Sequence, residues 1–328
     1  MIDVVIPAHE KDIDTLELAI EKTIENVNDI GEVYVISRDK MTNKARWIPE
    51  NSFSFSLGDV ASIIGTNRRT SWYYAMLLKM LAPVEIPNVS DKIVIMESDT
   101  LLLKPTSFIE EGNISLHSVS YDSNPPNNSY CEHITKLLPD FKFENDFSGI
   151  VHHAVAQRDI IENMIEKVES LYKMPFWKAC LEITLQEYRT NLHHVSTGEG
   201  CGKMADYEIL FHYPNFYFKD RVRIRPLKQI MAYKGNLGVS GFLRHTMDGK
   251  PFPSRTNLWG NKVIIPEKIQ KSFKFNCIRK AMRQIGEITS DLGWDMITFQ
   301  GHTRVERDLY TKSLQDSLER RLKKVEDL

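Results

Sequence analysis

The stretch IVIMESDTLLLKP, residues 93–105, combines a short apolar run, two carboxylates and a second apolar run. The first run, Ile93 to Met96, is rich in β-branched residues and predicts a buried strand. Glu97-Ser98-Asp99 interrupts the strand pattern, so it predicts a turn at the carboxyl end of that strand. Ligands of open α/β sheets bind beyond that end of the strands. The stretch therefore predicts a sheet with a site at its edge.

Strand and helix patterns alternate on the N-terminal side of this stretch. Apolar runs at Val4–Ile6 and Val33–Ile36 predict two more buried strands. Helical spacing of apolar residues predicts a helix from Ile13 to Val27, and Ser71 to Leu81 predicts a buried helix that stops before Pro83. Strands separated by helices imply a mainly parallel sheet with right-handed crossovers.

The C-terminal side is less regular. Arg158–Tyr172 predicts a helix and Met296–Gln300 a strand. The glycine-rich segment Gly198–Lys203 is one residue short of a P-loop and lacks its Ser or Thr, so we reject an ATPase and expect a closing loop. Residues 303–328 predict a charged helix that docks on the domain or pairs with a second copy, so a homodimer stays open. Binding to a membrane surface is the weaker alternative, because Asp and Glu interrupt the basic residues.

The composition limits the class of protein. The chain has 328 residues, 42% of them hydrophobic and 26% charged, as in globular proteins. A formal net charge of −2 gives no basic footprint for nucleic acid. No apolar stretch approaches the roughly 18 residues that span a bilayer, and no signal peptide is evident, so we expect a cytoplasmic protein. Widely separated cysteines without a CxxC pair predict neither a disulfide framework nor a zinc site: Cys131, Cys180, Cys201 and Cys277.

Glu97 and Asp99 are the strongest chemical signal. Two carboxylates at i and i+2 on a turn can reach one divalent ion, and carboxylate, water and diphosphate oxygens suit Mg²⁺ or Mn²⁺. Such an ion would neutralise charge developing on a departing nucleoside diphosphate. A solvated pair of surface acids is the alternative, because acid-x-acid sequences are common.

Several segments of the chain resemble those of a known family. Residues 93–105 are similar to the DxD segment of GT-A glycosyltransferases, and Val4 to His9 is similar to their first strand. Four further segments resemble a bacterial and viral branch of that superfamily: Arg69 with Trp72 and Tyr73, Leu77 to Lys79, Phe147 to Arg158, and Ala205 to Glu208. The resemblance covers most of residues 2–230. It implies a GT-A-like (Rossmann-like), mainly parallel sheet flanked by helices, and a metal-dependent transfer of sugar from a nucleotide-diphosphate sugar.

Three departures from the family pattern limit what carries over. Glu97 stands where Asp is usual, so it is expected to hold the metal through water. Ser71 stands where Gly is usual, and Ala75-Met76 replaces a pair of glutamines. The resemblance therefore assigns no donor contact to Ala75 or Met76.

The resemblance assigns donor contacts to the strand ends. Pro7, Ala8 and His9, and then Ser37 and Asp39, would hold the nucleoside, with Ser98 in the metal turn. Arg69, and less so Arg68, would contact the diphosphate, because guanidinium matches phosphate oxygens. The alternatives are a helix cap for Asp39, a loop histidine for His9 and a solvated Arg68. Lys79 lies within an apolar helix and is expected to support structure.

Acids near residue 206 and late histidines complete the candidate set. Asp206 and Glu208 would remove the acceptor hydroxyl proton, with Asp206 preferred, although acids also cap helix starts. His302 is a candidate third metal ligand. One of His152 and His153 would line the acceptor pocket or have a structural role.

The sequence thus predicts one domain over residues 1–302 and a C-terminal helix over residues 303–328. Residues 1–105 would bind the nucleotide sugar, UDP- or GDP-linked, and residues 106–302 the acceptor, a glycan or small molecule. A nucleotidyltransferase is one alternative, although the first strand lacks the glycine-rich signature of that class. An inactive nucleotide-sugar-binding scaffold is the other, suggested by Glu97 and Ala75-Met76.

Overall fold

The structure is a computed structural model that describes residues 1–65, 69–119, 129–190, 204–225, 227, 229–233, 283, 286–287, 290–291, 293 and 295–300. A central sheet of five strands has the order β3-β2-β1-β4-β8. Its strands are β1 (Ile2–Pro7), β2 (Ile30–Ser37), β3 (Arg46–Pro49), β4 (Lys92–Met96) and β8 (His153–Gln157). The first four run parallel and β8 runs antiparallel to β4. The predicted mainly parallel α/β sheet is confirmed.

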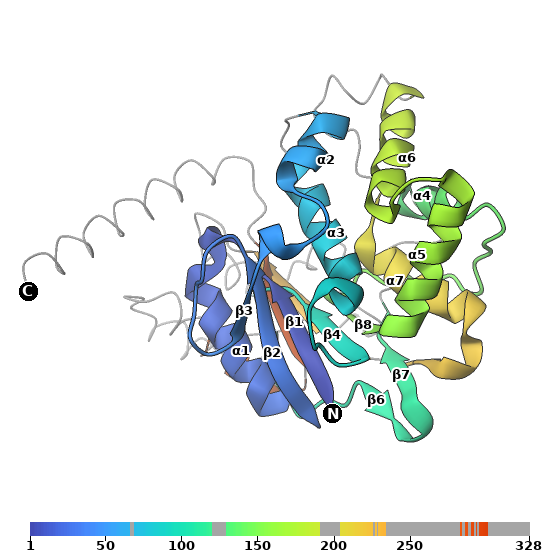
Figure 1. Cartoon of the computed structure of the whole chain (residues 1–328). Coiled ribbons are helices and arrows are strands. Elements are labelled where there is room, and N and C mark those ends of the chain that lie inside the picture. Colours follow the sequence, from blue (N-terminus) through green and yellow to red (C-terminus); the bar gives the residue numbers. More distant parts are fainter. Residues whose placement is uncertain are drawn as a thin grey trace, which may run out of the picture.

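Helices cover both faces of this sheet (Figure 1). They are α1 (Ile13–Asn26), α2 (Leu57–Ile64), α3 (Thr70–Glu85), α4 (Ser129–Leu137), α5 (Arg158–Tyr172), α6 (Phe176–Thr190) and α7 (Asp206–Tyr217). Short 3₁₀ turns occur at Glu10–Asp12, Glu50–Ser52, Glu111–Asn113 and Lys219–Arg221.

Strand β1 shows why the molecule has two cores. Its side chains alternate between the two faces of the sheet, as strand geometry requires. Val5 packs into the core that contains buried residues of α2 to α7, whereas Val4 and Ile6 pack into the core that contains Leu16 and Ile20 of α1. The first core joins residues from Val5 to Tyr213, so the two halves of the chain share it.

Strands that follow β4 in the sequence form two small three-stranded sheets. One has the order β10-β11-β5, from β5 (Thr100–Leu102), β10 (Gln229–Tyr233) and β11 (Met296–Gln300). The other has the order β6-β7-β9, from β6 (Ile109–Glu110), β7 (Ile114–His117) and β9 (Val222–Ile224). Strand β5 follows the 97–99 turn directly and pairs with β11, so late residues of the chain reach the end of β4.

The structure corrects two details of the predicted elements. Helix α3 continues past Pro83 to Glu85. A proline within a helix leaves one carbonyl, here that of Lys79, without its N–H donor. The packing around the buried Pro83 compensates for that loss. Strand β3 was not predicted, since it is a short edge strand with Arg46 and Trp47 exposed. The helices predicted at Arg158–Tyr172 and Ile13–Val27 and the strand predicted at Met296–Gln300 are confirmed, with α1 ending at Asn26.

The predicted glycine-rich loop at Gly198–Lys203 and the helix over 303–328 lie outside the described residues, as do Arg68 and His302. The boundary at residue 302 therefore stays a prediction. Among the described helices, none combines the length and apolar character needed to cross a membrane.

Candidate functional site

The turn after β4 is held in place by its backbone. The Glu97 N–H donates to the carbonyl of His152 (3.2 Å), and the Thr100 N–H donates to the carbonyl of Glu97 (3.1 Å). The antiparallel pairing of Met96 with His153 brings the start of β8 to this end of β4. Ser98 is buried, and Glu97 and Asp99 are half-buried. The two predicted acids therefore lie at the carboxyl edge of the sheet, as the sequence predicts.

Lys79 of α3 is the centre of the site. Its Nζ lies 2.6 Å from Glu97 Oε1 and 2.8 Å from Asp206 Oδ2, so one ammonium joins the turn after β4 to the start of α7. Tyr207 completes the group: its hydroxyl donates to Glu97 Oε1 (2.8 Å), and its ring lies 4.4 Å from the Lys79 Nζ. We call Lys79, Glu97, Asp206 and Tyr207 the lysine cluster.

The two carboxylates of the lysine cluster differ in their electrostatics. Burial raises the pKa of Glu97, but the charge and hydrogen bond of Lys79 outweigh it and bring that pKa to about 2. Burial also raises the pKa of Asp206, and there it outweighs the attraction of Lys79. Burial lowers the pKa of Lys79, yet the two carboxylates raise it above its ordinary value. Asp206 is therefore the carboxylate that takes up a proton first as the pH falls.

Sequence reasoning assigned Lys79 to structure and missed its position in the site. The signal that could have found it is its buried position in α3, where its neighbours Leu78 and Met80 are also buried. A buried ammonium needs a carboxylate partner, because taking an unpaired charge out of water is very costly. The sequence did not show which acids would reach it.

The lysine cluster limits how a divalent ion can bind. Glu97 Oε1 already accepts hydrogen bonds from Lys79 and Tyr207, and a dication on the same oxygen would lie against the ammonium. Glu97 therefore does not fit the role of a direct ligand, whereas an outer-sphere role through water fits. Asp99, two residues on and half-buried, is the described carboxylate of the predicted set that fits direct ligation.

The ends of β1 and β2 lie side by side. Pro7 pairs with Ile36 in the register of the two strands, so residues 7–9 and residues 37–39 leave the sheet together. Pro7 and Ala8 are buried, and His9 is exposed. The Ser37 hydroxyl donates to the carbonyl of Asp39 (2.8 Å). Strand register thus places both predicted nucleoside segments at one edge.

Asp39 is not a helix cap in the structure. Its Oδ2 accepts from Arg38 Nε at 2.9 Å, and Arg38 also pairs with Glu10. The side chains of Arg38 and Asp39 are 73% and 72% exposed, and such surface pairs contribute little stability. A ligand can therefore displace Arg38 from Asp39 at small cost.

Arg69 lies directly before α3, with its guanidinium 4.7 Å above the ring of Trp72. A helix that connects parallel strands runs back across the sheet, so the N-terminus of α3 is on the carboxyl side of the sheet. Arg69 is about 15 Å along the helix axis from Lys79, at about 1.5 Å a residue. Because Lys79 contacts Glu97 at the end of β4, Arg69 lies beyond the carboxyl edge and the two cations act at different distances from the sheet.

The structure separates Asp206 from Glu208. Successive residues of a helix are rotated by about 100°, so two residues apart they face nearly opposite directions. Asp206 faces Lys79 of α3, whereas Glu208 is fully buried and accepts from the Ser148 hydroxyl and the Gly149 N–H, both at 2.7 Å. The two predicted acids do not share one site, and Glu208 lies outside the lysine cluster.

The adjacent histidines also differ from each other. His153 is buried, and its Nδ1 must donate to the carbonyl of Val151 (3.0 Å) while Nε2 accepts from the Ser118 hydroxyl (3.0 Å). Burial lowers the pKa of His153 to about 3, so the ring is neutral at neutral pH. His152 is buried in a left-handed backbone conformation (φ 59°) beside the 97–99 turn. Both histidines lie at the carboxyl end of β4, and His152 is the one whose carbonyl accepts the Glu97 N–H.

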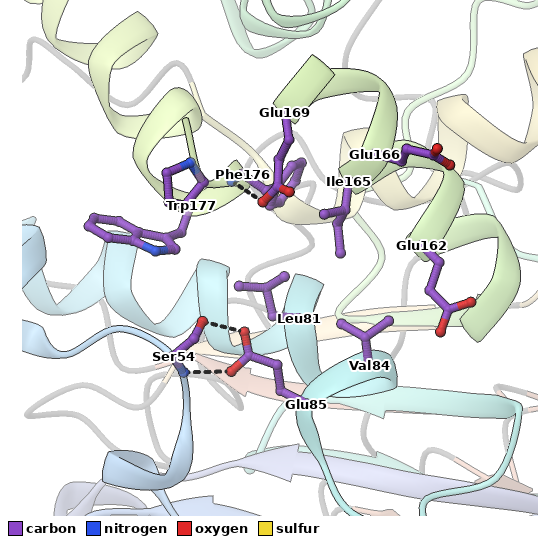
Figure 2. Close-up of a pocket in the computed structure, with 11 residues that line it drawn as sticks. Ser54, Leu81, Val84, Glu85, Glu162, Ile165, Glu166, Glu169, Phe176 and Trp177 are labelled. Atoms are coloured by element: carbon purple, nitrogen blue, oxygen red, sulfur yellow. Dashed lines mark hydrogen bonds between the residues drawn. The ribbon is translucent and has the colours of Figure 1, made fainter. Parts of the chain in front are cut away.

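A cavity of about 370 Å³ lies away from these residues (Figure 2). Leu81 and Glu85 of α3, Glu169 of α5 and Trp177 of α6 line it, and none of its lining residues belongs to the predicted site. Two of its acids are used in structure, since Glu85 binds Ser54 and Glu169 accepts the N–H of Phe176. This cavity is therefore not the candidate site.

No protein-family model matches the sequence. No curated protein matches it either.

Three of the solved structures that overlap the fold are glycosyltransferases by name. Mouse xyloside xylosyltransferase 1 in its apo form has 9% identity and a TM-score of 0.36, over 70% of this chain and 87% of that one. The galactosyltransferase LgtC with donor and acceptor sugar analogues has 13% identity and a TM-score of 0.33, over 55% of this chain and 69% of that one. An active-site mutant of LgtC has 10% identity and a TM-score of 0.33, over 70% of this chain and 75% of that one. These overlaps are partial, so the fold class is taken from the strand order of this chain.

Proposed function

We propose that this protein transfers a sugar from a nucleotide-diphosphate sugar, UDP- or GDP-linked, to an acceptor hydroxyl of a glycan or small molecule. One observation carries the proposal: Lys79 joins Glu97, at the end of β4, to Asp206, at the start of α7. Two segments that resemble the metal-binding and acceptor-side segments of GT-A glycosyltransferases thus meet at one ammonium. The carboxyl edge is also where α/β sheets bind nucleotides.

The donor would bind along this edge. His9, Ser37 and Asp39 offer polar groups to a nucleoside at the adjoining ends of β1 and β2. Arg69 offers paired N–H donors that match diphosphate oxygens. Asp99 would hold Mn²⁺ or Mg²⁺ directly, with Glu97 in the outer sphere and His302 as a further proposed ligand. Such an ion supplies positive charge to the diphosphate leaving group.

Asp206 is the proposed general base. The acceptor oxygen attacks the anomeric carbon, the bond from that carbon to the diphosphate oxygen breaks, and the hydroxyl proton passes to the Asp206 carboxylate. Lys79 keeps Asp206 ionised before the reaction, and burial keeps its pKa above the ordinary range, which favours proton uptake. Lys79 and Tyr207 act as positioning residues, since they hold Glu97 and Asp206 together.

The test is release of nucleoside diphosphate from a panel of nucleotide sugars, with Mn²⁺ or Mg²⁺ and without acceptor. We expect one donor to be hydrolysed slowly, and Asp99→Asn to reduce that release at least about 100-fold, within the range that loss of a group stabilising the transition state costs. Asp91→Asn is the matched control: Asp91 lies directly before β4, at the opposite end of the strand from Asp99, and is 92% exposed. It should leave release unchanged.

Other outcomes of this test identify the alternatives. Release of pyrophosphate from a nucleoside triphosphate would show a nucleotidyltransferase. A donor that raises the Tm without any release of nucleoside diphosphate would show a binding scaffold, because a ligand of the folded state alone raises stability. Either result overturns the transferase proposal.

A further inference from the structure

A second cluster of chemically active side chains lies outside the lysine cluster. Cys131 of α4 meets Glu208 and His212 of α7, and one ligand atom from each lies within 4.8 Å of the other two. Glu208 and His212 are at i and i+4, so they share one face of α7. All three residues are buried, with 0%, 0% and 1% of their surface exposed. We call them the Cys131–Glu208–His212 cluster.

His212 has an unsatisfied nitrogen. Its Nε2 is buried without a hydrogen-bond partner, and the nearest carboxylate oxygen, Glu208 Oε2, is 3.5 Å away, which is too long for a good bond. The rings of Phe143 and Phe211 pack against the imidazole, with centroids 4.8 Å away in each case. A buried polar atom left in this state costs about 1–3 kcal/mol, so a partner for Nε2 is expected.

We propose that this cluster binds one Zn²⁺ ion and that the ion fastens α4 to α7. Thiolate, imidazole and carboxylate are the ligands that zinc takes in proteins. Zn–N and Zn–O bonds of about 2.1 Å at a tetrahedral angle place the two ligand atoms about 3.4 Å apart, close to the observed 3.5 Å between Nε2 and Oε2. Water or the second Glu208 oxygen can take the fourth position.

The surroundings of Glu208 support this assignment. Zinc-ligating carboxylates are commonly oriented by outer-shell hydrogen bonds. Here the Ser148 hydroxyl donates to Oε1 and the Gly149 N–H to Oε2, which fixes the carboxylate towards His212. Binding would replace the thiol proton of Cys131 with the metal and release that proton to solvent. This proposal departs from the expectation that cysteine spacing gave, because spacing within the sequence does not show ligands that come from two distant helices.

The first test uses the wild-type chain. After incubation with Zn²⁺ and dialysis, we expect one zinc per chain and a Tm that falls when the metal is removed by a chelator. Co²⁺ in place of zinc should give a thiolate-to-cobalt charge-transfer band. A chain that retains no zinc and gives no such band overturns the proposal without any variant.

Variants then locate the metal. Cys131→Ser and His212→Gln should each weaken zinc binding by at least about 100-fold, more than loss of an outer-shell partner costs. Cys180→Ser is the matched control, because Cys180 is also a free, fully buried cysteine of a helix. It should keep one zinc per chain. Zinc that survives both cluster variants lies elsewhere, and zinc lost in Asp99→Asn belongs to the proposed donor site; both results refute the assignment.

Discussion

Replacing Lys79 with methionine removes the ammonium of the lysine cluster and keeps a side chain of similar length. The variant leaves Glu97 and Asp206 facing each other without a cation. Breaking a buried ion pair by removing one partner costs about 3–5 kcal/mol. Because 28% of the Glu97 side chain is exposed, water reaches it, and we expect the lower end, about 3 kcal/mol. Unfolding entropy of about 2.1 cal/mol/K per residue amounts to about 0.7 kcal/mol/K for 328 residues, so that loss lowers Tm by about 4 °C.

The pH dependence of this loss gives the sharper test. In the wild type the pKa of Glu97 is about 2, below its ordinary 4.5, so its stabilisation is complete above pH 4.5 and is lost as the pH falls towards 2. Without Lys79 the pKa values of both carboxylates rise, and the folded variant then binds protons that the unfolded chain does not. We therefore expect the deficit of Lys79→Met to shrink between pH 8 and pH 5.

Urea unfolding followed by circular dichroism at both pH values measures the deficit. Lys167→Met is the matched control, because Lys167 also pairs with a carboxylate, Asp140 at 2.9 Å, and lies 4.0 Å above the ring of Tyr217. That pair is exposed, so its loss should cost no more than about 1 kcal/mol. The charge argument is refuted if Lys79→Met loses no more free energy of unfolding than this control does. It is also refuted if the deficit of Lys79→Met is the same at pH 5 as at pH 8.

Two further predictions concern the packing and the buried histidines. Gly149→Ala should destabilise the fold by about 1–3 kcal/mol, because an added Cβ would meet Phe211 Cβ at 2.3 Å and the Tyr207 carbonyl at 2.4 Å. Gly58→Ala in α2 is its control in urea unfolding: its Cβ meets only Ser56 Oγ at 3.5 Å, so equal losses would contradict the packing argument. Burial lowers the pKa of His133 from 6.5 to about 4. Between these two values the unfolded chain binds a proton at His133 and the folded chain does not, so the stability that is present above pH 6.5 is lost as the pH falls. Between pH 7 and pH 5, the free energy of unfolding of His133→Gln should therefore fall by about 2 kcal/mol less than that of the wild type. If the variant and the wild type show the same pH dependence, His133 is not buried as a neutral ring.

The sequence alone determined most of the sheet and its functional edge. Apolar runs located β1, β2 and β4, because a buried strand must be apolar on both faces. The break in pattern at residues 97–99 located the turn at the carboxyl end of β4. These features are local, and the spacing of residues within one element is enough to show them.

Only the tertiary structure decided which charges meet. Periodicity shows that a position is buried, but it carries no information about the partner across the interface. Tyr207 reaches Glu97 over 110 positions of sequence, and Glu208 turns from Asp206 towards Cys131 because α7 rotates by about 100° a residue. The lysine cluster and the Cys131–Glu208–His212 cluster thus depend on how α3, α4 and α7 pack. That packing is determined by the free energy of the whole core and not by the sequence of any one helix.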